Sequence, residues 1–209
     1  MTPLDLRSTR LGNGLVVTSV QLPGARTACV GAYLRVGSRF EPAALAGIAH
    51  FFEHMVFKGT RTRGAYRLAL EAERAGGYMN AFTSKDHTGY YLNLPGDRIA
   101  GALELIAVVL ARSTFPRAEL ERERYVVLQE MAEAGDDAES LAQDCMDAAA
   151  FARHPLGRPI LGRRAVVRSI RQRALEDFLA RHCNSANMVL VGAGDVDHAR
   201  FAQIGRAHV

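Results

Sequence analysis

The stretch 46–57 constrains the fold of this chain more than any other segment. Apart from His50, Glu53 and His54, it is apolar on every side. A helix with this pattern belongs in the interior of a protein rather than on its surface. Because an isolated buried charge is very costly, each of the three polar side chains needs a partner there. The sequence therefore predicts a buried helix that carries a polar site.

Two histidines one helical turn apart indicate a metal site in this helix. His50 and His54 lie on one face at positions i and i+4, about 6 Å apart along the axis, and Glu53 borders the same face. A divalent metal ion would explain why an apolar helix tolerates this group. The order H-x-x-E-H is found in one class of zinc hydrolases. The alternative is a pair of core histidines hydrogen-bonded to backbone carbonyl groups.

A third ligand is needed, because a catalytic zinc ion usually takes three protein ligands and leaves a fourth position to water. Glu130 is the candidate, since its same-face neighbours Val126 and Val127 form an apolar stripe. Glu123 lies seven residues earlier, two turns away and nearly on the same line of the helix. For Glu123, an ordinary exposed helix glutamate is an equally good interpretation.

The remaining segments predict an α+β fold in a single domain. The strand patterns cover a hairpin at 5–21 around Asn13-Gly14, then 27–36, 78–83, 88–94 and 187–191. The helical patterns cover the His50 helix, opened by Pro42 and closed at Lys58-Gly59, and 65–75, 98–112, 116–134, 138–152 and 171–182. Because strands precede a run of helices and one strand returns at the end, we expect a mixed, mostly antiparallel sheet packed against helices.

Two weaker signals receive the simpler interpretation. Gly192-Ala193-Gly194 follows a strand but lacks the third glycine of a dinucleotide-binding loop, so it is predicted to be a turn. Asp86 and His87 could be metal ligands, but they fall in a connection between two strands. They are interpreted as solvated turn residues.

Composition limits the cellular compartments and the classes of partner that we expect for this protein. Three widely spaced cysteines without a C-x-x-C motif favour a reducing compartment. No uncharged apolar run approaches the ~18–20 residues of a membrane span, and the first ten residues do not form a secretory signal. We therefore expect a soluble cytoplasmic protein without a membrane partner. The net charge is +4, but the arginines are mostly scattered without interleaved aromatic residues, so a nucleic-acid partner is not expected.

Several motifs in register give the chain a resemblance to one enzyme family. The motifs are the H-x-x-E-H helix with 57–60 after it, the strand segment 76–84 with Thr88, the segment 127–131 that contains Glu130, and the later segments 154–157 and 160–162. Together they resemble the pitrilysin/insulinase family of zinc metallopeptidases, which includes mitochondrial processing peptidase. The resemblance covers about residues 5–200.

This resemblance implies roles for particular residues. It implies that His50, His54 and Glu130 bind Zn²⁺, that Glu53 is the general base, and that Glu123 is a supporting acidic residue. It also implies that a peptide substrate pairs as an added strand with the backbone of three residues in the 78–83 strand, namely Asn80, Ala81 and Phe82.

The family resemblance also shapes the expected domain organisation. Family members combine two or four such domains, so we expect residues 1–203 to be an N-terminal zinc-binding peptidase domain that works with a second homologous domain or subunit. Residues 204–209 match the translation of a common sequencing adapter and are expected to be a non-native tail. The leading functional hypothesis is a zinc endopeptidase domain. A non-catalytic partner subunit or scaffold, and a binding module whose histidines bind nothing, are the alternatives.

Overall fold

One sheet of six strands organises the computed structural model, which describes residues 4–208 and the side chains of residues 4–206. The strands are β1 (Asp5–Arg10), β2 (Val16–Gln21), β3 (Thr27–Leu34), β4 (Tyr78–Thr83), β5 (Thr88–Pro95) and β6 (Met188–Gly194). They lie in the order β1-β2-β6-β3-β5-β4. Strands β2 and β6 are parallel, and every other neighbouring pair is antiparallel. The predicted mixed, mostly antiparallel sheet is confirmed.

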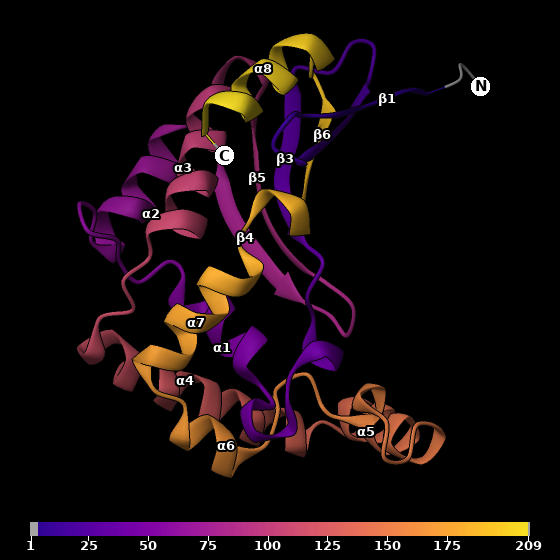
Figure 1. Cartoon of the computed structure of the whole chain (residues 1–209), viewed down its shortest axis with the longest axis vertical. Helices are drawn as coiled ribbons and strands as arrows, with labels where there is room; N and C mark the ends of the chain where they lie inside the picture. Colours follow the sequence, from indigo (N-terminus) through magenta and orange to yellow (C-terminus); the bar gives the residue numbers. More distant parts are fainter. Residues whose placement is uncertain (1–3, 209) are drawn as a thin grey trace.

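Helices cover the sheet and form a second group at one end of it (Figure 1). The helices are α1 (Ile48–Met55), α2 (Ala65–Arg74), α3 (Ile99–Arg112), α4 (Arg117–Asp136), α5 (Ala138–Ala150), α6 (Arg164–Ser169), α7 (Gln172–His182) and α8 (His198–His208). Helix α3 packs on β3 and β5, and α8 packs on β2 and on α3. The predicted α+β single domain is therefore confirmed.

The periodicity of side chains along each strand and helix explains which residues form the hydrophobic core. Along β3 the alternate residues Ala28, Val30, Ala32 and Leu34 are buried, as expected for a strand with one face against helices. Helix α3 contributes a wide apolar face to the same core. This layer forms the rigid support on which β5 and the edge strand β4 are held.

Helix α1 lies at the end of the sheet, where it contacts α4, α7 and β4. Its residues Phe51, Phe52 and Met55 are fully buried, and His50 is 7% exposed. The predicted burial of this helix is confirmed. Because α1 is enclosed by α4 on one side and β4 on another, its polar residues face both an acidic helix and a sheet edge.

The predicted start and end of α1 are wrong. The chain after Pro42 forms a 3₁₀ turn, Ala43–Leu45, and α1 begins only at Ile48. Gly47 precedes it with φ of +100°, a left-handed conformation that interrupts a helix and suits glycine. The helix ends at Met55, before Lys58-Gly59.

Two further predictions differ at the C-terminal half. The short helix α6 was not predicted, because six residues are too few for a helical period to stand out. The predicted turn at Gly192-Ala193-Gly194 is wrong, since these residues belong to β6 and pair with Val30, Cys29 and Ala28 of β3. The expected non-native origin of residues 204–209 stays a prediction.

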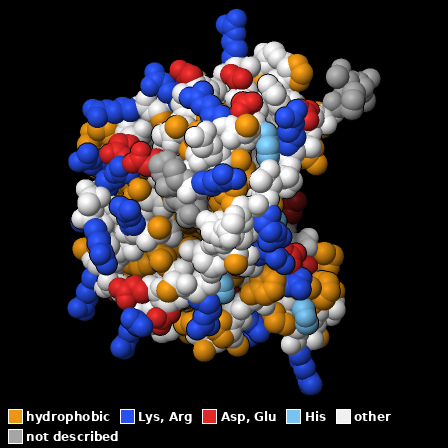
Figure 2. All heavy atoms as spheres, turned by 45° about the horizontal axis from the view of Figure 1, so that its top comes forward, with side chains coloured by type: hydrophobic (Ala, Val, Ile, Leu, Met, Phe, Trp, Pro, Cys, Tyr) orange, Lys and Arg blue, Asp and Glu red, His pale blue; other side chains and the backbone are white. Residues whose placement is uncertain are grey.

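The surface carries charges of both signs. On the face shown in Figure 2, Lys and Arg side chains lie scattered, with acidic side chains between them. Among residues 4–208 there is no helix with the length and apolar character required to cross a membrane.

Candidate metal centre

Three side chains from two helices converge beside the buried part of α1. His50 and His54 project from the same face of α1, with ring centroids 4.7 Å apart. Glu130 reaches them from α4. One of its carboxylate oxygens lies 3.5 Å from His50 Nε2, and the other lies 3.5 Å from His54 Nε2. One ligand atom from each of the three residues lies within 4.8 Å of the others. The structure thus brings together the three predicted metal ligands.

The chemistry of this group fits a divalent cation. Glu123 faces Nδ1 of His54 at 3.2 Å, which favours a proton on Nδ1, and the neutral ring then has a lone pair on Nε2 toward Glu130. Lone pairs and carboxylate oxygens that face one another repel unless a positive charge lies between them. Ligands of a tetrahedral zinc ion with bonds of ~2.0–2.1 Å are about 3.3 Å apart, close to the two separations seen here.

The charges of the site shift the pKa values of Glu130 and His54. The nearby rings of His50 and His54 hold the pKa of Glu130 well below its ordinary value. Burial lowers the pKa of His54, but the contacts with Glu130 and Glu123 outweigh burial and raise it overall. Glu130 is therefore ionised, and a cation between the rings would replace the proton that His54 otherwise favours.

Glu123 contacts His54 on the side of the ring opposite Glu130. It is 8% exposed and accepts contacts from two directions, with one oxygen 3.2 Å from His54 Nδ1 and the other 2.7 Å from Lys58 Nζ. A carboxylate bonded to the outer nitrogen of a ligand histidine fixes the ring orientation and raises the basicity of the ligand atom. The interpretation of Glu123 as an exposed helix residue is wrong, and its predicted place beside the site is the one observed.

Glu53 lies between α1 and the sheet edge rather than among the three ligands. Its carboxylate accepts a hydrogen bond from the Thr83 hydroxyl, with 2.5 Å between Thr83 Oγ1 and Glu53 Oε2. Thr83 is the last residue of β4. The predicted general base is thus held between the cluster of His50, His54 and Glu130 and the edge strand β4.

The edge strand β4 carries the three predicted substrate-binding residues. It pairs with β5 on one side, and no strand among residues 4–208 pairs with it on the other. The amide nitrogen of Ala81 donates to the Asn80 side-chain oxygen at 2.8 Å, so this N–H is not used in the β4–β5 ladder. Phe82 packs its ring near those of Tyr33 and His87, on the side of the sheet away from α1. An outward row of backbone groups is the feature that strand addition requires.

Asp86 and His87 lie outside the cluster of His50, His54 and Glu130, in the connection between β4 and β5. Both are exposed, and Asp86 forms an ion pair with Arg39 at 2.6 Å. His87 contacts the Ser84 hydroxyl instead. Their interpretation as turn residues agrees with these positions.

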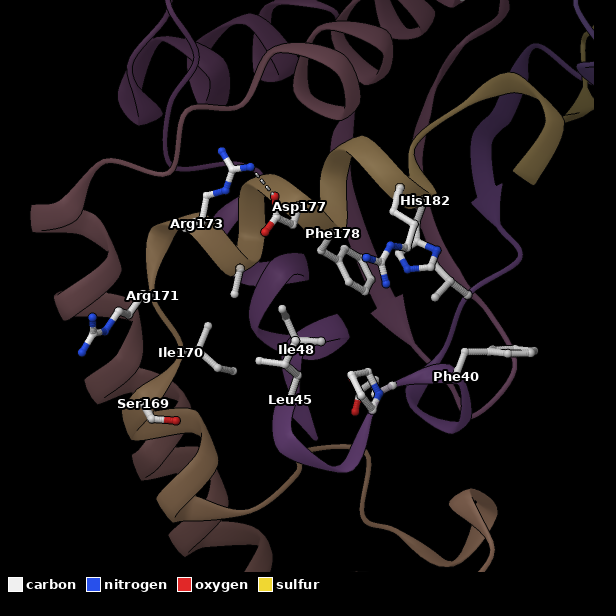
Figure 3. A pocket seen from close by; sticks show the side chains of 15 residues that line it. Phe40, Leu45, Ile48, Ser169, Ile170, Arg171, Arg173, Asp177, Phe178 and His182 are labelled. Carbon is white, nitrogen blue, oxygen red and sulfur yellow. Dashed lines mark ion pairs between the residues drawn. The ribbon is translucent and has the colours of Figure 1, made fainter.

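A cavity of about 450 Å³ lies on another side of α1, between Ile48 and α7 (Figure 3). Its walls include Leu45, Ile48, Ile170 and Phe178. Two arginines of α7, Arg173 and Arg181, also line it. None of the predicted site residues lines it. The cavity and the cluster of His50, His54 and Glu130 are therefore separate features of the molecule.

The sequence analysis assigns no functional role to two residues that contact the site, Lys58 and Thr83. Lys58 follows α1 and pairs with Glu123, and Thr83 bonds Glu53. Both belong to the sequence motifs named above. However, no periodicity or spacing in the sequence indicates which residue each of them contacts. Only the packing of α4 and β4 against α1 reveals these contacts.

Comparison with known families identifies the chain. Residues 16–164 match the model of the family described as Insulinase (Peptidase family M16). The chain belongs to the insulinase family of peptidases. The predicted family resemblance is confirmed.

Relatives in this family carry peptidase names. The chain is 40% identical over 202 residues to an uncharacterized zinc protease of Mycobacterium tuberculosis, covering 97% of this chain and 46% of the relative. It is 38% identical to the beta subunit of the mitochondrial-processing peptidase of Bos taurus, covering 98% of this chain and 41% of the relative. The chain thus spans less than half the length of these two relatives.

A solved structure shares the fold of this insulinase-family chain. The crystal structure of a protease from Helicobacter pylori matches with a TM-score of 0.92 and 26% identity. The match covers 98% of this chain and 50% of that protein. Half of a longer peptidase therefore has the architecture described here.

Proposed function

We propose that this chain is a zinc-dependent endopeptidase domain that hydrolyses peptide bonds of short or unfolded peptides. The observation that carries the proposal is the convergence of His50, His54 and Glu130 on one point, with Glu53 beside them and an open strand edge alongside. The printed names of the relatives, a zinc protease and a processing peptidase, support the same chemistry.

The proposed mechanism assigns separate tasks to the residues of the site. His50, His54 and Glu130 would hold the zinc ion, and Glu123 would orient His54. Bound zinc supplies a Lewis acid that acidifies water and polarises the scissile carbonyl. Glu53 accepts the proton of the attacking water and passes it to the leaving amine.

The substrate would bind along β4. The outward backbone groups of β4, which include those of Ala81, would pair with an extended peptide along Asn80, Ala81 and Phe82, which places the peptide backbone along the sheet edge and next to Glu53. Binding of this kind reads backbone groups, so unfolded segments are the suitable substrate class. In the free protein, the Ala81 N–H is occupied by the Asn80 side chain, which a substrate carbonyl would have to replace.

The activity would need more than this domain. Because the relatives are more than twice as long as the matched part, we propose that residues 1–203 act with a second homologous domain or subunit. We also propose that residues 204–209 are a non-native tail and that the protein is cytoplasmic. On this account, turnover by the present chain alone is weak.

Hydrolysis of an unstructured fluorogenic peptide tests the function. We expect slow cleavage that a chelator abolishes and zinc restores, and Glu53→Gln should remove cleavage while zinc content stays at the parental level. A Glu53→Gln variant as active as the parent would overturn the general-base assignment.

The same assay separates the proposal from its main alternative. A non-catalytic partner or scaffold would bind zinc without any chelator-sensitive cleavage, even when the matching second half of a relative is supplied. The intact set of His50, Glu53, His54 and Glu130 favours the catalytic alternative, because a scaffold has no need of a general base.

A further inference from the structure

Thr83 is the hydrogen-bond partner of Glu53 among the side chains that the structure describes. Its hydroxyl donates to Glu53 Oε2 at 2.5 Å, a short distance typical of a hydroxyl bonded to an ionised carboxylate. The bond occupies one oxygen of Glu53 and leaves the other available for the proton of a water molecule. It also restricts the rotation of a side chain that has three flexible torsions.

The alternation of side chains along β4 accounts for the direction of Thr83. Met79 and Ala81 point into the core side, where both pack against buried residues. Thr83 shares their parity and therefore faces α1, whereas Asn80 and Phe82 face the opposite side of the sheet. A hydroxyl at the last residue of the strand thus meets Glu53 without any local distortion.

The backbone that follows Thr83 is fixed from two sides. Thr83 pairs with Thr88 in the β4–β5 hairpin, and the amides of Ser38 and Arg39 donate to the carbonyls of Ser84 and Lys85, each at 3.0 Å. This approach depends on Gly37, where a Cβ atom would lie 2.5 Å from the Ser84 carbonyl oxygen.

The Lys85 side chain adds a third anchor. Its ammonium group donates to the carbonyl oxygens of Leu156 and Arg158 at 2.9 and 2.7 Å and pairs with Asp147 at 2.9 Å. The loop after Thr83 is therefore held against the 3₁₀ turn Ser38–Phe40 and against the α5 region. A donor mounted on such a support can define the position of its acceptor.

We propose that Thr83 is a positioning residue that holds the Glu53 carboxylate in its reactive orientation through this hydrogen bond. The proposal rests on the proposed peptidase function, in which Glu53 is the general base. Because β4 also carries the substrate strand, one element would set the position of both the peptide and the base. Misplacement of a catalytic group by about 1 Å costs as much as a hundredfold in rate, so even a modest loss of order should be measurable.

The kinetic test compares Thr83→Val, which has nearly the same shape without the hydroxyl, with Thr83→Ser, which retains a hydroxyl. We expect Thr83→Val to lower kcat about tenfold with KM nearly unchanged, and Thr83→Ser to recover most of the rate. Thr18→Val is the matched control, because Thr18 is a half-buried strand residue in β2 whose hydroxyl contacts Ser8 far from the site. An unchanged kcat in Thr83→Val would overturn the proposal.

A second measurement does not depend on turnover. Side-chain NMR couplings of Glu53 should indicate one rotamer in the parent and in Thr83→Ser, and rotamer averaging in Thr83→Val. Equal averaging in all three proteins would contradict the positioning role, whether or not the chain cleaves peptides.

The two proposals fail in different ways. If Glu53→Gln remains active, the base assignment of the proposed function fails. If Glu53→Gln is inactive but Thr83→Val is fully active, only the role of Thr83 fails.

Discussion

The orientation of His54 depends on a residue from a distant helix. Glu123 of α4 lies 3.2 Å from its Nδ1 atom, and Lys58 holds the same carboxylate at 2.7 Å. We predict that Glu123→Gln weakens zinc affinity about tenfold to a hundredfold, because the neutral amide fixes the ring less well and raises its basicity less. Competition with a chromophoric chelator measures this affinity.

Glu133→Gln is the control for this change, since Glu133 is an exposed residue of the same helix. We expect its zinc affinity to equal that of the parent. Equal affinities for Glu123→Gln and Glu133→Gln would show that Glu123 has no influence on the ligand.

Among the elements, α1 depends on a buried carboxylate at its start. Glu41 accepts hydrogen bonds from the amides of Gly47 and Ala49 at 2.7 Å each. Burial raises the pKa of Glu41 to about 7, although these two donors act in the opposite direction. The folded protein therefore keeps a proton that the unfolded chain loses above about pH 4.5.

This pKa difference predicts a pH dependence of stability. A raised pKa in the folded state gives stability that is present below the unfolded pKa and lost as the pH rises toward 7. We predict that the unfolding free energy of the parent, relative to the non-titrating Glu41→Gln variant, falls by roughly 2 kcal/mol between pH 5 and pH 8. Urea unfolding with a chelator present measures it, and a relative stability that rises with pH would contradict the prediction.

The β4–β5 connection depends on a close backbone approach at Gly37. A Cβ atom there would lie 2.5 Å from the Ser84 carbonyl oxygen, so Gly37→Ala should destabilise the fold by about 1–3 kcal/mol. Gly101 of α3 offers a matched control, since a Cβ atom there meets nothing within 4 Å. Gly101→Ala should stabilise the helix by up to ~1 kcal/mol. Thermal unfolding distinguishes the two, and equal effects would refute the argument.

For the molecule as a whole, the sequence predicted more of the metal centre than of its supports. The i, i+4 spacing of His50 and His54 defines one helix face, and the apolar stripe around Glu130 marks an inward position. These signals are local, so they can be read without a fold. The contact of Thr83 with Glu53 joins residues 30 apart and requires the packing of β4 on α1.

The errors in the sequence predictions have two different origins. Pro42 and the alanines after it have no local feature that delays the helix, but the left-handed Gly47 and the Glu41 cap begin α1 at Ile48. Gly192 and Gly194 resemble a turn locally, yet pairing with β3 retains them in β6. Tertiary pairing overrides local preference in β6, whereas residues close in sequence set the start of α1.

The proposed second domain leads to a prediction about which property of this chain depends on it. We expect residues 1–209 alone to bind zinc as tightly as a full-length relative but to cleave a fluorogenic peptide at least about a hundredfold more slowly, because the proposed second domain would supply groups that position the substrate. Parallel assays of this chain and the longer Mycobacterium tuberculosis relative measure the ratio. Equal rates would show that one domain suffices.

The metal content of the purified protein tests the central claim most directly. After dialysis against trace zinc, elemental analysis should find about one equivalent in the parent and in His87→Gln, which alters an exposed histidine outside the cluster. His50→Ala and Glu130→Gln should retain almost none, because each removes one of three ligands. A parent without zinc, or a His50→Ala variant with a full equivalent, would contradict the account.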